Sequence, residues 1–325
     1  MTKAPIPQSK IYNLVNLYIK DNYNDELIKK YGTISEWNTS LITNMSCLFQ
    51  KTCINPDISS WDVSNVKDMS YMFQSNIIFN QPLDRWNVSR VKNMSHMFYN
   101  AKSFNQSLDQ WNVSSVKDMS CMFASSESFN QPLNNWDVSS VNNMESMFAE
   151  AKSFNQPLDR WNVSRVENMS YMFACTMYFN QSLDRWNVSQ VETMLCMFRS
   201  AIYFNQPLNN WNVSQVENMK GMFAEAKSFN QPLDRWNVSQ VENMSYMFYY
   251  AESFNQPLST WNVSRVIDMS YMFCKALSFN QLLDQWNVSQ VENMSYMFWY
   301  AISFGYNLDL WIIPDRNVHN IFHNE

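Results

Sequence analysis

Tryptophan recurs at a spacing of 25 residues through most of this 325-residue chain. Only the first step, from Trp37 to Trp61, is one residue shorter. A fixed period of roughly 20–50 residues indicates a repeat architecture, in which each unit buries its apolar face against its neighbours. We therefore divide the chain into twelve repeats, and Trp299 lies outside the series. The series is Trp37, Trp61, Trp86, Trp111, Trp136, Trp161, Trp186, Trp211, Trp236, Trp261, Trp286 and Trp311.

Two hydrophobic periods follow one another inside each repeat. Trp86 and Val88 are separated by one polar residue, which is the spacing of a strand with alternating faces. Met94, Met97 and Phe98 follow steps of three and four residues, which place them on one face of a short helix. The position before this segment holds only residues that can cap a helix N-terminus. That column is Asn44, Asp68, Asn93, Asp118, Asn143, Asn168, Thr193, Asn218, Asn243, Asp268 and Asn293.

These patterns predict an α/β fold, namely a curved, leucine-rich-repeat-like solenoid. Parallel strands would line its concave face and short helices its convex face. Parallel strands lie about 4.8 Å apart, whereas packed helices need about 8–10 Å between their axes, so the stack should bend. A tighter parallel β-helix is the alternative fold, and the capping column argues against it. The chain has only 3 glycines, so we expect asparagines such as Asn105 to make the turns.

The N-terminal segment departs from the repeat. Residues 9–22 have the pattern of an amphipathic helix. Residues 24–31 predict a second short helix that ends at Gly32. We therefore expect residues 1–32 to form a helical cap over the first repeat, because the open end of a repeat stack exposes core residues.

The pattern decays again at the other end. Gly305 replaces the asparagine of the turn, Pro314 replaces a serine, and His319 stands where a methionine is expected. We therefore assign residues 33–304 to the solenoid and residues 305–325 to a degenerate last repeat with a C-terminal cap.

The motif L-x-x-W-x-V-S-x-V-x-x-M-x-x-M-F-x-x-A-x-x-F-N-Q resembles the repeats of the mycoplasma-type, BspA-like leucine-rich-repeat surface proteins. The resemblance covers roughly residues 33–311, and Leu83, Trp86 and Val88 stand at the leucine positions of its strand segment. It implies a leucine-rich-repeat-like solenoid without catalysis. Members of that family look like bacterial surface or adhesion proteins, and similar repeats occur in large DNA viruses and in algae. The motif is structural, so it transfers no functional residues.

Composition narrows the classes of partner and location. The formal net charge of −6 argues against binding to nucleic acid. The first residues lack the apolar segment of a signal peptide, and no stretch approaches the ~20 apolar residues of a membrane-spanning helix. We therefore expect a cytoplasmic protein or a virion component that does not insert into a membrane, with exposure on a surface as the alternative.

The residues that could carry chemistry favour structural roles, so we expect no cofactor, no metal site and no enzyme activity. Methionine pairs such as Met94 and Met97 resemble a soft-metal pattern, but their helical spacing is typical of core packing. The 6 cysteines include no C-x-x-C pair and are expected to be reduced. His96 is expected to be exposed, and His319 and His323 lie four residues apart without a third ligand.

The candidate binding surface is the outward side of the predicted strands. Arg85 and Asn87 flank the inward Trp86, and their counterparts form two columns on the concave face. We predict that the asparagines form a ladder in which each amide bonds to the next. The arginine column varies between repeats and is our candidate for contact with a protein or glycan. The candidate residues are Arg85, Asn87, Asn112, Arg160, Asn162, Arg185, Asn187, Asn212, Arg235, Asn237, Asn262 and Asn287.

A third column changes its charge along the chain, and it is either a solvated face or a polarity that orients the protein on a partner. It runs through Lys67, Lys92, Lys117, Asn142, Glu167, Glu192, Glu217, Glu242 and Glu292.

These features predict a non-enzymatic scaffold for protein–protein interaction or structural assembly, inside a cell or a virus particle. Its partner is an unidentified protein or a second copy bound through the ends of the solenoid. The alternative is an adhesin or receptor-like protein on a cell or virion surface. An enzyme would have to use residues that break the repeat, such as Gly221, Trp299 or the caps.

Overall fold

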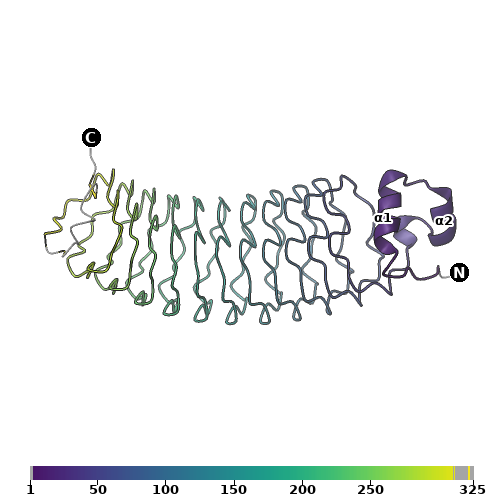
Figure 1. Cartoon of the computed structure of the whole chain (residues 1–325), viewed down its shortest axis with the longest axis horizontal. Helices are drawn as coiled ribbons and strands as arrows, with labels where there is room; N and C mark the ends of the chain where they lie inside the picture. Colours follow the sequence, from purple (N-terminus) through teal and green to yellow (C-terminus); the bar gives the residue numbers. More distant parts are fainter. Residues whose placement is uncertain (1–2, 310, 312–320, 323–325) are drawn as a thin grey trace. The chain divides into compact units, whose positions relative to one another are not determined.

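The computed structural model describes residues 3–309, 311 and 321–322. The chain forms two compact units, an N-terminal unit of residues 1–157 and a C-terminal unit of residues 158–325. Within each unit, every 25-residue repeat forms one coil that packs against its sequence neighbours (Figure 1). The predictions that concern Pro314, His319 and His323 fall outside the described residues.

Two α-helices occur near the N-terminus, α1 (Ile11–Lys20) and α2 (Asp25–Tyr31) (Figure 1). The Oδ1 atom of Asn24 accepts a hydrogen bond from the backbone N–H of Leu27 at 3.0 Å and so caps α2. Gly32, with φ at 81°, ends this helix. Both helices predicted from the sequence are therefore confirmed, although α1 is shorter than the predicted range.

The segment before α1 covers the open edge of the first coil. The side-chain oxygen of Gln8 accepts the backbone N–H groups of Thr43 and Asn44 at 2.8 Å and 3.0 Å. The amide nitrogen of Gln8 donates to the carbonyl oxygen of Asn44 at 2.8 Å. In later repeats the preceding coil supplies such an acceptor, as when Lys92 N–H bonds to the carbonyl of Lys67 at 2.8 Å. Gln8 therefore replaces a missing neighbour at the edge of the stack.

The predicted α/β fold is wrong. The only other helix among the described residues is the short 3-10 helix η1 (Ile34–Glu36), and from Trp37 to residue 309 the repeats contain neither helices nor strands. Consecutive coils are joined by isolated parallel bridges, such as the one between Asn93 and Asp118, which do not extend into a sheet. The chain is therefore not a leucine-rich-repeat-like solenoid with strands on one face and helices on the other. The same residues also lack the parallel sheets of a β-helix, which was the alternative fold.

Left-handed residues prevent the predicted helix from forming. In one repeat Tyr71 and Ser75 have φ values of 59° and 54°. The N–H of Met72 bonds to the carbonyl of Met69 at 3.2 Å, which closes a turn of four residues, while the N–H of Tyr71 bonds to the carbonyl of Ser95 in the next coil at 2.9 Å. Alternate N–H groups therefore serve the turn and the neighbouring coil. A helix would use all of them internally.

The left-handed positions are not those predicted. The described residues with positive φ include 21 that are not glycine, and the asparagines of the Phe-Asn-Gln segments are not among them. Tyrosine, serine, cysteine, histidine, glutamate and lysine all occupy these positions. Such a conformation costs roughly 1 kcal/mol or more per residue. The hydrogen bonds between coils and the buried core offset that cost.

The asparagines of the Phe-Asn-Gln segments join the coils instead. The Oδ1 atom of Asn230 accepts the backbone N–H of Asn255 at 2.9 Å and the side-chain amide of Gln256 at 3.0 Å. Asn230 in turn donates its own N–H to the Oδ1 of Asn205 at 3.0 Å. This arrangement satisfies polar backbone groups that would otherwise be left without partners between the coils.

Stacked aromatic rings fill the core inside each unit. The rings of Trp86 and Trp111 are parallel and 6.4 Å apart, and the indole N–H of Trp111 donates to the carbonyl of Leu83 at 2.9 Å. The rings of Phe98 and Phe104 stack at 4.0 Å within one coil. The methionine pairs are fully buried, as the core interpretation predicted. Identical coils thus place identical side chains in contact, which explains the regular spacing of the sequence.

Candidate functional site

All twelve candidate residues of the two outward columns are exposed. They lie on turns and irregular segments, so they line no sheet and no concave strand face. Each residue between the two columns, such as Trp86 between Arg85 and Asn87, is buried. The alternation of inward and outward side chains was therefore predicted correctly, and the secondary structure that carries it was not.

The asparagine column does not form the predicted ladder. The Oδ1 atom of Asn87 accepts the backbone N–H of Ser89 at 3.2 Å, and that of Asn212 accepts Ser214 at 3.2 Å. Each of these amide oxygens closes a turn within its own coil, which is a common use of asparagine in loops. The ladder between coils belongs to a different asparagine, exemplified by Asn230.

The arginine column has a mixed electrostatic character. An aspartate precedes each of its four arginines in sequence, as Asp234 precedes Arg235. The backbone N–H of Arg235 donates to the Oδ1 of Asn209 at 3.0 Å, which fixes this segment on the preceding coil. Asn210, in the same column as Arg235, donates its amide to the carboxylate of Asp184 at 3.0 Å and 3.1 Å. The aspartates beside the arginines would repel a polyanion, because they place negative charge next to each cation.

The column that changes charge is exposed from Lys67 to Glu292. Its backbone links the coils, since Glu192 N–H bonds to the carbonyl of Glu167 at 2.9 Å. Glu242 forms an ion pair with Arg265, whose Nη2 lies 3.0 Å from the carboxylate. No helix follows this column, so its glutamates do not stabilise a helix N-terminus.

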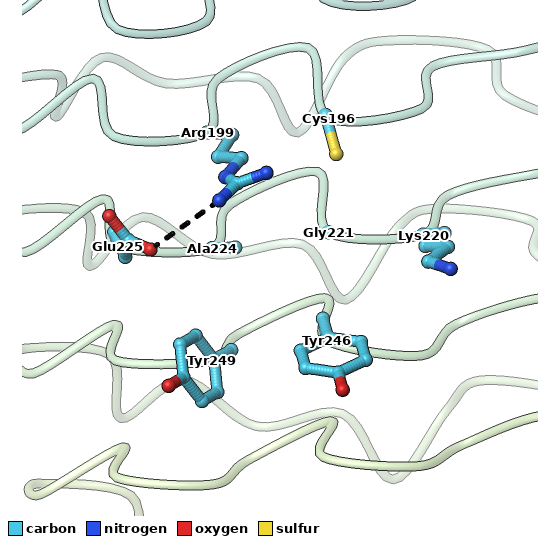
Figure 2. A pocket seen from close by; sticks show the side chains of 8 residues that line it. All are labelled: Cys196, Arg199, Lys220, Gly221, Ala224, Glu225, Tyr246 and Tyr249. Carbon is cyan, nitrogen blue, oxygen red and sulfur yellow. Dashed lines mark ion pairs between the residues drawn. The ribbon is translucent and has the colours of Figure 1, made fainter.

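A pocket opens in the C-terminal unit where a repeat lacks an aromatic ring (Figure 2). The first left-handed position of each coil forms a column that we call the ring column. In this unit it runs through Tyr171, Cys196, Gly221, Tyr246, Tyr271 and Tyr296. Tyr246 and Tyr271 stack at 4.7 Å, and Tyr271 and Tyr296 stack at 5.0 Å. Cys196 and Gly221 carry no ring, so the stack of tyrosines ends at Tyr246.

We call this cavity the Gly221 pocket, and its volume is about 440 Å³. Two small residues of one coil, Gly221 and Ala224, form its floor. Tyr246 and Tyr249, whose rings meet edge to face at 5.5 Å, form one wall, and Figure 2 shows both on the coil that follows Gly221. The lining residues are Cys196, Arg199, Lys220, Gly221, Ala224, Glu225, Tyr246 and Tyr249.

The charges in the pocket are unequal. Arg199 lies 3.9 Å from the carboxylate of Glu225, which also accepts the hydroxyl of Ser200 at 2.7 Å. Lys220 is exposed and makes no ion pair with any described residue, and its Nζ lies 6.0 Å from the ring centre of Tyr246. One cation therefore remains available beside an aromatic face.

Sequence reasoning singled out Gly221 as a residue that breaks the repeat but did not infer a pocket. The signal was present in the adjacent residue as well. The following repeat carries Ser245-Tyr246 and the preceding one Leu195-Cys196, where this repeat carries Lys220-Gly221. The loss of a large ring and the gain of a cation at adjacent positions mark this coil.

The structure offers little for metal or thiol chemistry. No group of three histidine, cysteine, aspartate or glutamate side chains suited to a metal ion occurs among the described residues. All 6 cysteines are free. Burial raises the pKa of the Cys196 thiol, and burial raises the pKa of Cys121 and of Cys274 to about 11. Such thiols are protonated at neutral pH and are weak nucleophiles.

His96 is half-buried, which contradicts its predicted exposure. Its ring stacks on Tyr71 with centres 4.4 Å apart, and its Nδ1 atom is buried without a hydrogen-bond partner. Burial lowers the pKa of His96, opposed by the nearby carboxylates of Asp118 and Glu145. The side chain therefore behaves as an aromatic member of the ring column.

The stacked coils define a tandem-repeat protein. The family described as "Mycoplasma protein of unknown function, DUF285" matches the chain over residues 19–135, 84–182, 107–203, 158–256 and 232–325, and the chain belongs to this family. This agrees with the mycoplasma-type repeats recognised in the sequence. No match was found among curated proteins. Within the described residues, no helix has the length and apolar character needed to cross a membrane.

Proposed function

We propose that this chain is a non-enzymatic scaffold that binds a protein partner through the exposed side chains of its repeats. The observation that carries the proposal is the contrast between buried and exposed columns. Position 86 and its equivalents are always tryptophan and buried. The position before it changes from Arg85 to Gln110, Asn135 and Thr260 while remaining exposed. A constant framework with a variable surface is the usual design of repeat proteins that bind other proteins.

Charge favours a protein over a nucleic acid as the partner. The chain has a net charge of −6, and an aspartate precedes each arginine of the arginine column. The 6 free cysteines favour a reducing compartment, inside a cell or a virus particle. Self-association through the ends of the repeat stack is the second mode of assembly that we consider.

The test uses residues that the repeats already tolerate. In the variant Arg160→Asn, Arg185→Asn, Arg235→Asn, the column takes the residue found at Asn135 and Asn210. The tagged full chain is crosslinked in its source cells, and partners and crosslinked sites are identified by mass spectrometry. We expect a reproducible protein partner whose crosslinks map to this column, with a yield lowered at least ~10-fold in the variant.

The matched control removes three arginines from another exposed column, as Arg90→Gln, Arg165→Gln, Arg265→Gln, again with a residue that this column holds elsewhere, at Gln240. It should keep the partner. Equal losses in both variants would reject the arginine column as the binding surface. Recovery of neither a partner nor a second copy of the chain would contradict the scaffold function itself.

The resemblance to mycoplasma-type surface proteins favours a second candidate, an adhesin displayed on a cell or virion. Protease treatment of intact cells or particles separates the two. Cleavage of this protein while a cytosolic marker stays intact would support the surface function, and full protection would support the internal scaffold.

A further inference from the structure

Two adjacent positions of the ring column, Cys196 and Gly221, carry no ring, and Gly221 is the one that borders a stacked tyrosine. The ring of Tyr246 is stacked on Tyr271 on one side, at 4.7 Å, and borders the Gly221 pocket. Aromatic faces are among the strongest anchors at protein interfaces, because they bury large areas with little loss of side-chain freedom. A ring that enters the pocket would extend the tyrosine stack that begins at Tyr246.

The charged groups around the pocket favour an occupant that carries an anionic group. Arg199 is paired with Glu225, whereas Lys220 has no anionic partner among the residues described. Lys220 stands on the same coil as Gly221 and on the side of the pocket away from Glu225 (Figure 2). An anionic group beside the bound ring would therefore meet a cation at the Lys220 end and a carboxylate at the other.

We propose that the Gly221 pocket binds an aromatic side chain of a protein partner that carries an acidic residue next to it. The ring stacks on Tyr246 and the carboxylate lies against Lys220. This inference rests on the proposed scaffold function, since it identifies the type of side chain that the partner presents. The proposed binding is non-covalent, and burial raises the pKa of the Cys196 thiol in the pocket wall, which disfavours the reactive thiolate.

Filling the pocket from within gives a direct test. Gly221→Tyr introduces the residue of the following coil, and tyrosine already adopts this left-handed conformation there, at Tyr246, with φ at 59°. A Cβ atom at position 221 would lie 3.0 Å from the Sγ of Cys196, so that thiol must shift slightly. The N-terminal unit contains the same succession, Cys47 followed one repeat later by Tyr71, both left-handed.

The probes are blocked dipeptides added to the full chain, with Kd measured by ligand-detected NMR. N-acetyl-Asp-Tyr-amide tests the proposed chemistry, N-acetyl-Asp-Leu-amide removes the ring, and N-acetyl-Lys-Tyr-amide reverses the charge. We expect millimolar binding of the first and binding at least ~10-fold weaker of the second, as expected for one stacked ring. The charge-reversed peptide should also bind more weakly. Free 4-hydroxyphenylacetate should bind more weakly than the first peptide, and tighter binding of this acid would overturn a protein source for the ligand.

Two variants and a control complete the test. Gly221→Tyr should abolish binding of the first peptide, whereas Ser146→Tyr, which adds the same ring to the ring column of the N-terminal unit, should leave it unchanged. Lys220→Ser, which introduces the serine of the following repeat at Ser245, should remove the preference for aspartate over lysine and keep the preference for tyrosine over leucine. This second variant decides the outcome if Gly221→Tyr fails to fold.

Equal binding of the tyrosine and leucine peptides, or binding that survives in a folded Gly221→Tyr protein, would overturn the proposal. The failure of the pocket and the failure of the scaffold function remain distinguishable. A partner that still crosslinks to the arginine column while the pocket binds no peptide rejects the pocket alone.

Discussion

The indole N–H of Trp211 donates a hydrogen bond to the carbonyl oxygen of Leu183, 28 residues earlier in the chain, at 2.9 Å. The same bond recurs along the series, as from Trp186 to the carbonyl of Leu158 at 2.9 Å. A tryptophan therefore both fills the core and joins two coils. Phenylalanine would keep most of the area and lose the bond.

Replacement of this tryptophan should weaken the C-terminal unit. The carbonyl of Leu183 accepts two hydrogen bonds, and Trp211→Phe removes one of them, leaving the bond from the N–H of Trp186 at 3.0 Å. The substitution also opens a small cavity, and we expect a loss of about 2–4 kcal/mol in the free energy of unfolding. Urea denaturation followed by circular dichroism measures it. Trp299→Phe is the matched control, because Trp299 is half-buried and outside the series, and it should cost clearly less. Equal costs would contradict a special role for the series.

The two kinds of asparagine should differ in the same assay. Asn230→Ala removes the acceptor of two hydrogen bonds between coils, and we expect a cost of about 1–3 kcal/mol, because the N–H of Asn255 loses its partner. Asn237→Ala removes only the turn bond to Ser239 at 3.2 Å on an exposed loop, and its cost should stay below about 1 kcal/mol. The opposite order would mean that the exposed column carries the ladder after all.

His96 should make the protein sensitive to acid. Burial lowers the pKa of His96 in the folded state, so the folded chain favours the neutral ring. Its contribution to stability is complete above the unfolded pKa of about 6.5 and is lost as the pH falls through the lower folded pKa. His96→Tyr, which inserts the ring found at Tyr71, should flatten this acid dependence of the unfolding midpoint. NMR titration of the wild-type imidazole should give a pKa below 6.5, and a higher value would contradict the expectation.

Thiol labelling should separate the cysteines by their surroundings. Burial raises the pKa of Cys121 to about 11, so little thiolate is present at pH 8. Reaction with iodoacetamide, followed by mass spectrometry, should be slow at Cys121 and should accelerate as the pH approaches its pKa. The exposed Cys53 should react faster at pH 8, and labelling of both residues at one rate would show that Cys121 is not protected.

The raised pKa of Cys121 also affects stability in alkali. The folded state favours the neutral thiol, so its contribution is complete below the unfolded pKa of about 8.5 and is lost as the pH rises towards about 11. Cys121→Ser, a residue present at Ser146 in the same column, should therefore reduce the loss of stability between these limits.

Burial could be predicted from the sequence, and the backbone could not. The steps between Met94, Met97 and Phe98 identified inward side chains correctly. A helix and a series of four-residue turns bury the same positions, so the spacing of the apolar residues alone does not distinguish them. The deciding feature is the left-handed backbone at residues such as Tyr71 and Ser75, whose types give no hint of it.

The candidate surface shows the same limit. Exposure of Arg85 and Asn87 followed from their alternation with Trp86. The ladder was assigned to the wrong asparagine, because an amide can close a local turn or bridge two coils, and its neighbours decide which. The amide oxygen of Asn87 accepts a hydrogen bond from the N–H of Ser89 and so closes a local turn. The sequence showed Gly221 only as a break in the repeat, and the structure shows that a pocket lies beside it.

The indoles of the tryptophan series also have an optical consequence. In the C-terminal unit the rings from Trp161 to Trp311 are separated by 6.2 to 6.4 Å and are tilted by no more than 9° from one to the next. Chromophores at this separation exchange excitation energy, so the energy absorbed by one indole moves along the row before emission. Transfer between parallel rings keeps the direction of the emitting dipole, so the emission of the folded chain should stay polarised, and one ring turned out of parallel would depolarise it. The protein thus carries its own spectroscopic reporter of register between coils.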